Sequence, residues 1–431
     1  MDPVFMRFDL DRRGVPGMRH HICYLHRGRL LDIPFGGGWE TNWQGRCPEC
    51  GFKTFPVMYI YEPQSIMVSE SPAGWEGLRP LYLTEEEVCH NSWYGPCYDD
   101  ETEVLTKEGW QAFGKLGKDT ELATRGADGT LVWTKPVRLF AYPYRGKMWH
   151  TDLTYVNLLV TPNHKLYLKR RNGKEFEFMH ACDAANAGRF KMLSRVDYEG
   201  PDLSTFTIPG HETVSYSGRG NRVKRVYRSE AITVKMDDWL EFLGYYLTEG
   251  TPFPRVSLTQ SMKAHPLVWQ RIRDCATRMG LRWSGDKDKL HIWHTGLREY
   301  LKQFGYSRDR FVPRELMNLS RRQLHILLNA LMSGDGNQTW LKGDKGQFVS
   351  SSHQLKVDVQ ELELKCGDGA ILGKYGKVWI RRGNRGMSPT VKPCQQDWVN
   401  YDGTVYCAEV PGHLLLVRRQ GKVIWCSNSE L

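Results

Sequence analysis

Residues 158–168 read LLVTPNHKLYL. An apolar run is followed by a polar turn and then by alternating apolar residues, which predicts two short strands joined by a turn. Pro162 and Asn163 belong to the residue types that favour such a turn. Short strands of this kind, separated by Gly, Asp, Asn or Pro, extend outward over residues 97–225. The sequence therefore predicts an all-β region here.

The pattern changes to a mixed one over residues 236–395 and returns to β-formers after residue 403. Apolar residues at helical spacing predict four helices within the mixed region, at residues 236–250, 265–281, 320–336 and 353–367. Short β-rich stretches separate these helices. A mixed α/β segment is thus nested inside a β segment, as expected for one domain inserted into another.

Composition limits the class of protein. The chain has 431 residues, 40% of them hydrophobic, and carries a net charge of +10. No stretch approaches the run of about 20 apolar residues that crosses a membrane, and the first residues lack the apolar core of a signal peptide. We therefore expect a cytoplasmic protein without membrane contact. The positive charge favours a polyanionic partner such as nucleic acid.

Four motifs then occur in order along the β segment. They are Cys97 opening CYDDETEVLTKEGW, Thr161-x-x-His164, VYCAEVPGHLLLV containing His413, and WCSNS at residues 425–429. Together they resemble the motifs of inteins, the protein-splicing elements whose Hint fold is shared with the self-cleaving domains of hedgehog proteins. The resemblance covers residues 97–428. It implies an all-β, horseshoe-like splicing domain that excises itself and joins Pro96 to Ser429.

The resemblance assigns a role to each motif residue. Cys97 would attack the preceding carbonyl to form a thioester, because a thiol is a suitable nucleophile near neutral pH. His164 would protonate the leaving amine, with Thr161 helping to polarise the bond. Ser429 would then accept the acyl group, and Asn428 would cyclise and release the excised element. Splicing of this kind requires no cofactor.

Three positions depart from the usual intein pattern. Ser427 stands where a histidine usually precedes the terminal asparagine, so His413 becomes the candidate for assisting cyclisation. Cys407 occupies a position where an aspartate is common and where some inteins keep a nucleophilic cysteine; it would either tune acyl transfer or pack in a strand. Pro96 precedes Cys97, and its ring would hinder the first acyl shift.

The mixed segment contains two further related motifs. FLGYYLTEG at residues 242–250 and LNALMSGDG at residues 328–336 resemble the two LAGLIDADG motifs of homing endonucleases. The resemblance implies a pseudo-dimeric α/β domain whose paired helices bring Glu249 and Asp335 together to bind Mg²⁺ at the scissile phosphates. Lys289 and Lys377 are candidates for a basic activating residue. The expected partner is double-stranded DNA, cut at the site of the uninterrupted host gene.

Residues 1–96 differ from the remainder because they are rich in Gly, Pro and Trp. Cys47-x-x-Cys50 has the spacing of a zinc knuckle, although no second such pair is present. The sequence therefore leaves open a Zn²⁺ site or two free cysteines. The predicted division is 1–96 for a host segment (N-extein), 97–235 and 396–428 for the splicing domain, 236–395 for the endonuclease, and 429–431 for the start of the C-extein.

Other functions remain as alternatives at this stage. A hedgehog-type domain would cleave without ligation, but such a domain requires neither Asn428 nor Ser429. An inactive intein relic would have the same sequence motifs. A zinc-containing nucleic-acid-binding module would rest on residues 1–96 alone. The leading hypothesis is a monomeric, microbial or phage-encoded intein that acts on its own flanking exteins, in a host protein that the sequence does not identify.

Overall fold

A computed structural model describes residues 97–217, 223–286, 288–337, 345–373, 376–381 and 388–428. It also describes the backbone of six short strands in the first 96 residues: β1 (Val4–Met6), β2 (Met18–Cys23), β3 (Arg29–Pro34), β4 (Gly45–Arg46), β5 (Lys53–Pro56) and β6 (Ile66–Val68). β1 pairs with β6, and the other four form a sheet in the order β3-β2-β5-β4. Cys47, Cys50 and Ser429 lie outside the described residues. Among the described residues, no helix combines the length and apolar character needed to cross a bilayer.

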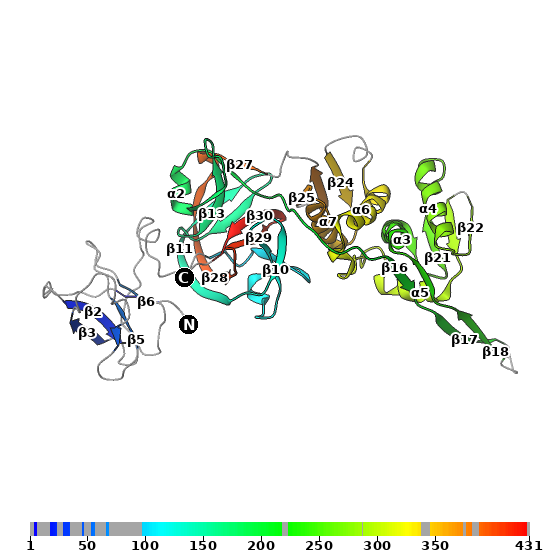
Figure 1. Cartoon of the computed structure of the whole chain (residues 1–431), viewed down its shortest axis with the longest axis horizontal. Helices are drawn as coiled ribbons and strands as arrows, with labels where there is room; N and C mark the ends of the chain where they lie inside the picture. The colour runs from blue at the N-terminus through cyan, green and yellow to red at the C-terminus, as the bar shows by residue number, and fades with distance from the viewer. Residues whose placement is uncertain are drawn as a thin grey trace.

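Residues 97–198 and 388–428 build one predominantly β body, here called the outer unit (Figure 1). Its elements are β7 (Glu103–Thr106), β8 (Gly109–Ala112), β9 (Leu122–Arg125), β10 (Leu131–Thr134), β11 (Arg138–Asp152), β12 (Asn157–Val160), β13 (Lys165–Arg170), β14 (Glu177–His180), α2 (Ala181–Asn186), β15 (Phe190–Met192), β27 (Thr390–Val391), β28 (Asp397–Glu409), β29 (Leu414–Arg419) and β30 (Lys422–Ser427). The sheets run β10-β9-β29-β7-β8, with β30 on β29, then β12-β11-β28 and β14-β13-β15-β27. Each of these three sheets therefore contains strands that precede the insert and strands that follow it.

The hairpin β29–β30 is buried on both faces. Leu415, Val417, Ile424 and Cys426 face a core that belongs to the outer unit alone. The alternate residues Leu414, Leu416, Val423 and Trp425 join a second core, which continues into the insert. This two-sided burial explains why the hairpin is an almost continuous apolar run rather than an alternating one.

Residues 205–381 form the insert, which contains two similar halves. The first half consists of α3 (Met236–Glu249), β20 (Gly250–Thr251), β21 (Val256–Thr259), α4 (Pro266–Arg278), β22 (Trp283–Gly285), β23 (Lys289–Ile292) and α5 (Thr295–Leu301). The second consists of α6 (Arg321–Asp335), β24 (Lys345–Val349), α7 (His353–Lys365), β25 (Gly369–Leu372) and β26 (Lys377–Arg381). The strand orders are β20-β21-β23-β22 and β24-β26-β25. A bridge from Gly336 to Phe348 in the second half matches the pairing of Gly250 with Leu258 in the first.

The helices α3 and α6 pack against each other through small residues. A Cβ atom at Gly244 would lie 2.5 Å from the Cβ of Ala330 and 2.9 Å from the carbonyl oxygen of Leu327. A Cβ atom at Gly334 would collide with Thr248 in the same way. Glycine at these positions thus permits a close helix approach, which places the C-terminal ends of both helices side by side.

A long antiparallel hairpin precedes α3. It comprises β16 (Thr205–Ile208), β17 (His211–Ser217), β18 (Val223–Ser229) and β19 (Ile232–Lys235), and Figure 1 shows β17 and β18 extending away from the helices of the insert. The ring of Phe206 stacks on Trp239 of α3 with centroids 4.1 Å apart. β16 and β19 therefore pack against α3 and belong to the insert, whereas the predicted division of the chain places them with the splicing domain. Strand periodicity identifies a strand but does not show which body it joins.

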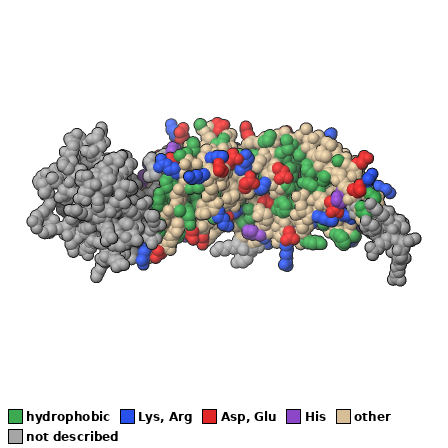
Figure 2. Space-filling view, turned by 90° about the horizontal axis from the view of Figure 1, so that it is seen from below, with side chains coloured by type: hydrophobic (Ala, Val, Ile, Leu, Met, Phe, Trp, Pro, Cys, Tyr) green, Lys and Arg blue, Asp and Glu red, His purple; other side chains and the backbone are tan. Residues whose placement is uncertain are grey.

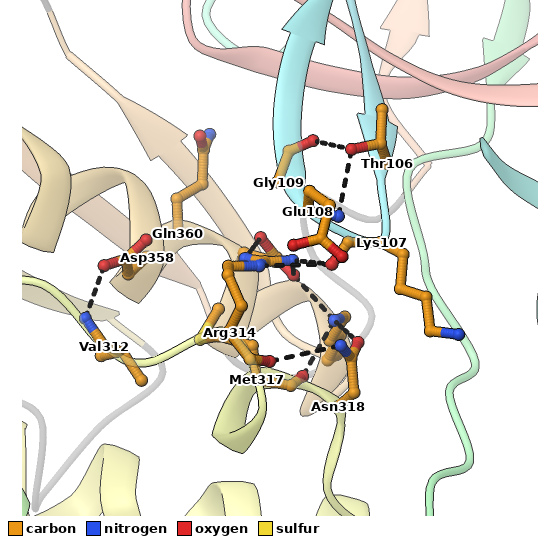
Figure 3. Close-up of polar contacts among 12 residues, drawn as sticks. Thr106, Lys107, Glu108, Gly109, Val312, Arg314, Met317, Asn318, Asp358 and Gln360 are labelled. Atoms are coloured by element: carbon orange, nitrogen blue, oxygen red, sulfur yellow. Dashed lines mark hydrogen bonds and ion pairs between the residues drawn. The ribbon is translucent and has the colours of Figure 1, made fainter. Parts of the chain in front are cut away.

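Polar contacts as well as apolar ones join the outer unit to the insert. The guanidinium of Arg314 donates to the carbonyl oxygen of Lys107 at 2.8 Å and pairs with the carboxylate of Glu361 at 2.7 Å (Figure 3). Lys365 pairs with the same carboxylate at 2.7 Å, and Glu361 and Lys365 are both at most 1% exposed. The charges of Glu361 and Lys365 are thus paired inside the interface rather than solvated.

The outer surface carries charge of both signs. On the face seen in Figure 2, Lys and Arg side chains are interspersed with Asp and Glu side chains over both units. The net positive charge of the chain is therefore not gathered on this face.

Candidate splicing site and paired carboxylates

Cys97 is fully buried, and Thr161 hydrogen-bonds with both its main-chain N–H and its carbonyl oxygen. The main-chain N–H of Cys97 donates to Oγ1 of Thr161 at 3.0 Å, and the N–H of Thr161 donates to the carbonyl oxygen of Cys97 at 3.0 Å. The nitrogen of Cys97 belongs to the bond that an acyl shift would break. A hydroxyl at that nitrogen is suitably placed to orient the bond.

The turn Thr161–His164 explains the spacing of the second motif. The N–H of His164 donates to the carbonyl oxygen of Thr161 at 2.9 Å, so these residues are the first and fourth of one tight turn. Both are fully buried. The ring of His164 meets the ring of Tyr98 edge-on, with centroids 4.4 Å apart. The turn therefore brings the hydroxyl of Thr161 and the imidazole of His164 next to Cys97 and Tyr98, in agreement with the T-x-x-H spacing.

A second cysteine lies opposite Cys97. Tyr98 and Tyr406 form an antiparallel bridge with two N–H to carbonyl hydrogen bonds of 2.8 Å. In that register, Cys97 and Cys407 are cross-strand neighbours. Burial raises the pKa of the Cys97 thiol well above its usual value, and the nearby Cys407 raises it further. Cys97 is therefore a protonated thiol, which would have to lose its proton to act as a nucleophile.

Asn428 enters the same region from the other end of the chain. It is 1% exposed, its Nδ2 donates to the carbonyl oxygen of Val410 at 2.8 Å, and its main-chain N–H donates to the carbonyl oxygen of His413 at 3.1 Å. The hydroxyl of Tyr98 donates to the carbonyl oxygen of Ser427. The residue after Cys97 is thus hydrogen-bonded to the residue before Asn428.

His413 contacts Asn428 through its main chain. Its φ is 59°, and its side chain is exposed, while its carbonyl oxygen contacts Asn428. The positive φ belongs to the turn after β28, where Gly412 also has a φ of 84°. The structure therefore shows a main-chain contact of His413 with Asn428, and the assistance of its imidazole in cyclisation stays a prediction.

Cys426, which lies in the WCSNS motif, belongs to this site, although the resemblance to inteins assigns it no role. Its Sγ lies 3.3 Å from Nε2 of His164, and both side chains are fully buried. Burial raises the pKa of Cys426 to about 12. A signal for this residue exists in the sequence, because Cys426 and Asn428 are two positions apart and a strand would place them on one face.

Glu249 and Asp335 occupy equivalent positions at the ends of α3 and α6. Gly250 and Gly336 follow them with nearly the same backbone angles, φ −89° and ψ 153° against φ −85° and ψ 158°. Burial raises the pKa of Asp335 to about 7, and the charge of Glu249 contributes to this rise. Burial also raises the pKa of Glu249. Two half-buried carboxylates thus repel each other at neutral pH.

A divalent cation would relieve that repulsion, because Mg²⁺ is commonly held by one or two carboxylates plus water and phosphate oxygens. Within the described ranges, no group of three or more His, Cys, Asp and Glu side chains could hold a metal by itself. The two carboxylates therefore suit a site completed by water and phosphate. Lys289 and Lys377, the candidate activating residues, begin the equivalent strands β23 and β26.

Comparisons with known proteins give distant similarities, and no protein-family model matches the chain. The chain is 24% identical over 424 residues to a DNA-directed RNA polymerase subunit beta C-terminal section from Stigeoclonium helveticum, covering 82% of this chain and 37% of that protein. It is 25% identical over 309 residues to an ATP-dependent Clp protease proteolytic subunit from Chlamydomonas moewusii, covering 66% of this chain and 29% of that protein. The chain thus spans about a third of the length of these relatives.

Among solved structures, the chain is similar to a splice-inactive variant of the AceL NrdHF class 3 split intein. The identity is 12%, and the match covers 46% of this chain and 97% of the other. The TM-score of the match is 0.19.

Proposed function

We propose that residues 97–428 excise themselves from the chain and join Pro96 to Ser429. The observation that carries this proposal is the hydrogen bond from Tyr98 to Ser427, which joins two residues 329 positions apart. It brings the residues next to both splice junctions into one buried site that also contains Thr161 and His164. A purely structural β domain does not require a cysteine and an asparagine from its two ends, here Cys97 and Asn428, to be buried in one site.

In the first step, Sγ of Cys97 attacks the carbonyl carbon of Pro96. The amide bond between Pro96 and Cys97 breaks and a thioester forms. His164 delivers one proton to the leaving nitrogen of Cys97 and takes up the proton released by the thiol, and Thr161 holds the amide during attack. Because every reacting group is on one chain, proximity contributes much of the rate.

The remaining steps move the acyl group and release the element. Oγ of Ser429 attacks the thioester carbonyl, which forms an ester at Ser429 and regenerates the thiol of Cys97. Nδ2 of Asn428 then attacks the carbonyl carbon of Asn428, which closes a succinimide and breaks the bond to Ser429. The freed amine of Ser429 attacks the ester carbonyl, and an ordinary peptide bond joins Pro96 to Ser429. The contact of Asn428 Nδ2 with Val410 supports a fixed orientation of the attacking amide.

The two relatives support the idea of a mobile inserted element. An RNA polymerase section and a Clp protease subunit are named as different proteins, yet their matches of 82% and 66% must overlap on this chain. A segment shared by two differently named proteins fits an element carried in both. The identity of the host of this chain is not implied by either name.

Splicing is tested by expressing the chain with a longer C-terminal extension and weighing the products by intact-protein mass spectrometry. We expect excised residues 97–428 and a ligated Pro96–Ser429 product. Cys97→Ala should stop N-terminal cleavage and ligation, whereas Asn428→Ala should leave a branched ester that added thiol cleaves. Ser429→Ala should give cleavage without joining, which is the outcome of a hedgehog-type domain. A wild-type chain that never processes would indicate an inactive relic.

We also propose that the insert cuts double-stranded DNA with Mg²⁺ held by Glu249 and Asp335. The repulsion between these carboxylates, expressed in the pKa of about 7 for Asp335, is the observation that favours a cation between them. When bound, Mg²⁺ would polarise the scissile phosphate. Glu249→Gln and Asp335→Asn should abolish cutting of the uninterrupted host site yet retain DNA binding, because phosphate contacts supply most of the affinity. Cutting by both variants would show that the metal is held elsewhere.

A further inference from the structure

The contact between Cys426 and His164 has no role in the splicing steps given above. Sγ and Nε2 are 3.3 Å apart, and the two residues are 262 positions apart in the chain. We propose that Cys426 is a positioning residue whose thiol donates to Nε2 of His164 and so keeps the ring proton on Nδ1. This proposal rests on the proposed splicing function, because His164 matters there as the proton donor to Cys97.

The chemistry of the pair decides which atom donates. Burial raises the pKa of Cys426 to about 12, so its sulfur carries a proton at neutral pH. A neutral imidazole has one nitrogen that donates and one that accepts. Sγ has two acceptors within reach, Nε2 of His164 at 3.3 Å and the carbonyl oxygen of Lys165 at 4.0 Å. A thiol that donates to the nearer acceptor, Nε2, selects the tautomer with its proton on Nδ1. A base or acid oriented by a third group is the general arrangement of catalytic pairs.

The surroundings prevent the ring from adopting another arrangement at low cost. Tyr98 packs edge-on against the His164 ring, and its hydroxyl donates to the carbonyl oxygen of Ser427 and also hydrogen-bonds with the side chain of Cys426. Cys426 is fixed in turn because Leu415 pairs with it across the β29–β30 hairpin. The strand that ends at Asn428 thus also orients the imidazole that serves Cys97. The position of β30 therefore affects the geometry of both proposed splice junctions.

The first experiment measures the thioester step alone. An Asn428→Ala background blocks C-terminal cleavage, and the rate of thiol-induced N-terminal cleavage is followed against pH. Cys426→Ala should slow this rate by about 10- to 100-fold. This is the loss of affinity or activity that follows when the hydrogen-bond partner of a metal-binding histidine is removed. Cys426→Ser should restore most of the rate, because a hydroxyl also donates. Its pH profile should follow the wild type, whereas that of Cys426→Ala should shift.

A matched control separates this role from packing. Cys275 is another fully buried thiol, and its Sγ donates to the carbonyl oxygen of Asp238 at 3.3 Å inside the insert. Cys275→Ala should leave N-terminal cleavage unchanged. The proposal is overturned if Cys426→Ala cleaves at the wild-type rate with the wild-type pH profile. It is also overturned if Cys426→Ser is as slow as Cys426→Ala while both remain folded.

A second measurement does not depend on activity. The ¹⁵N NMR shifts of the His164 ring in a Cys97→Ala chain report which nitrogen carries the proton. We expect Nδ1 to be protonated when Cys426 is present and a mixture of tautomers in Cys426→Ala. A proton on Nε2 with Cys426 present overturns the proposal. If no chain processes, the splicing proposal fails, and the NMR result still decides the orientation of His164.

Discussion

The side-chain oxygen of Gln360, in helix α7 of the insert, accepts a hydrogen bond of 2.9 Å from the guanidinium of Arg418, in strand β29 of the outer unit. Gln360 is fully buried, and its Nε2 also donates to the carbonyl oxygens of Gly421 at 2.7 Å and Ala370 at 3.1 Å. Arg418 pairs with Glu103 on its other side at 2.7 Å. The insert is therefore hydrogen-bonded to the hairpin that leads to Asn428, and Figure 3 shows the neighbouring contacts of Arg314.

Gln360→Ala should destabilise both units together. The substitution removes three buried hydrogen bonds and leaves Arg418 and two carbonyl groups without this partner, which we expect to cost about 2–4 kcal/mol of unfolding free energy. Because one apolar core spans both units, a single transition should shift in chemical denaturation. His353→Ala, at an exposed position of the same helix, is the control and should change little. Separate transitions, with only the insert weakened, would contradict the shared core.

Tyr98→Phe should slow the release of the C-terminal segment. The variant keeps the ring against His164 but loses the hydroxyl that holds the carbonyl of Ser427. We expect C-terminal cleavage, measured by mass spectrometry in a Cys97→Ala background, to fall about tenfold, the equivalent of one hydrogen bond of about 1.4 kcal/mol. Tyr246→Phe removes a comparable hydroxyl contact, to the carbonyl of Leu301 at 3.3 Å in the insert, and should have no effect on this step. Equal slowing in both variants would point to general destabilisation.

The stability of the metal-free protein should fall as the pH rises from about 4 to about 7. The pKa of Asp335 is about 7 in the folded protein, because of burial and Glu249, against about 4 in an unfolded chain. A raised folded pKa means that the folded state holds the proton more tightly, so the stabilisation is complete at low pH and is lost through pH 7. We expect a change on the order of 1–2 kcal/mol after allowance for solvent screening.

Denaturation at pH 5 and pH 8 with a chelator measures this change. Asp335→Asn should reduce the pH dependence and leave the part due to Asp358, whose pKa burial also raises to about 7. Added Mg²⁺ should reduce it in the wild type because the cation favours the ionised carboxylates. Asp288→Asn, at an exposed acid of the same unit, serves as the control. A pH dependence that Mg²⁺ leaves unchanged would count against a cation between Glu249 and Asp335.

Gly244→Ala should impair DNA cutting more than splicing. The added Cβ would lie 2.5 Å from that of Ala330, so α3 and α6 must separate, at a cost of about 1–3 kcal/mol. That separation also moves Glu249 away from Asp335. Gly285→Ala meets its nearest neighbour at 3.5 Å and should be tolerated. Measurement of Mg²⁺-dependent cutting and of splicing on the same preparations would show whether the two activities separate as expected.

Several features of the site could be predicted because they depend on local chemistry. The T-x-x-H spacing predicts Thr161 and His164 together, since the first and fourth residues of a tight turn lie close to each other. The acid–glycine pair at the end of each motif helix likewise predicts the equivalence of Glu249 and Asp335. The catalytic roles of these residues remain predictions.

Other features depend on contacts between distant segments. Helical periodicity predicts α7, but it does not predict that Gln360, Glu361 and Lys365 are buried, because such residues usually face solvent. They become buried only through partners such as Arg314 and Arg418, which come from other elements.

The sequence by itself determined the elements and the reactive residue types, because turn chemistry, periodicity and nucleophile identity are properties of short segments. Only the tertiary structure decided that Cys426 contacts His164, that β16 and β19 pack against α3, and that Tyr98 reaches Ser427. The first and last of these depend on strand pairing between segments that the insert separates, and the second depends on the packing of a hairpin against a neighbouring helix. The register of such long-range pairs follows from the burial of whole faces, which no short stretch of sequence specifies.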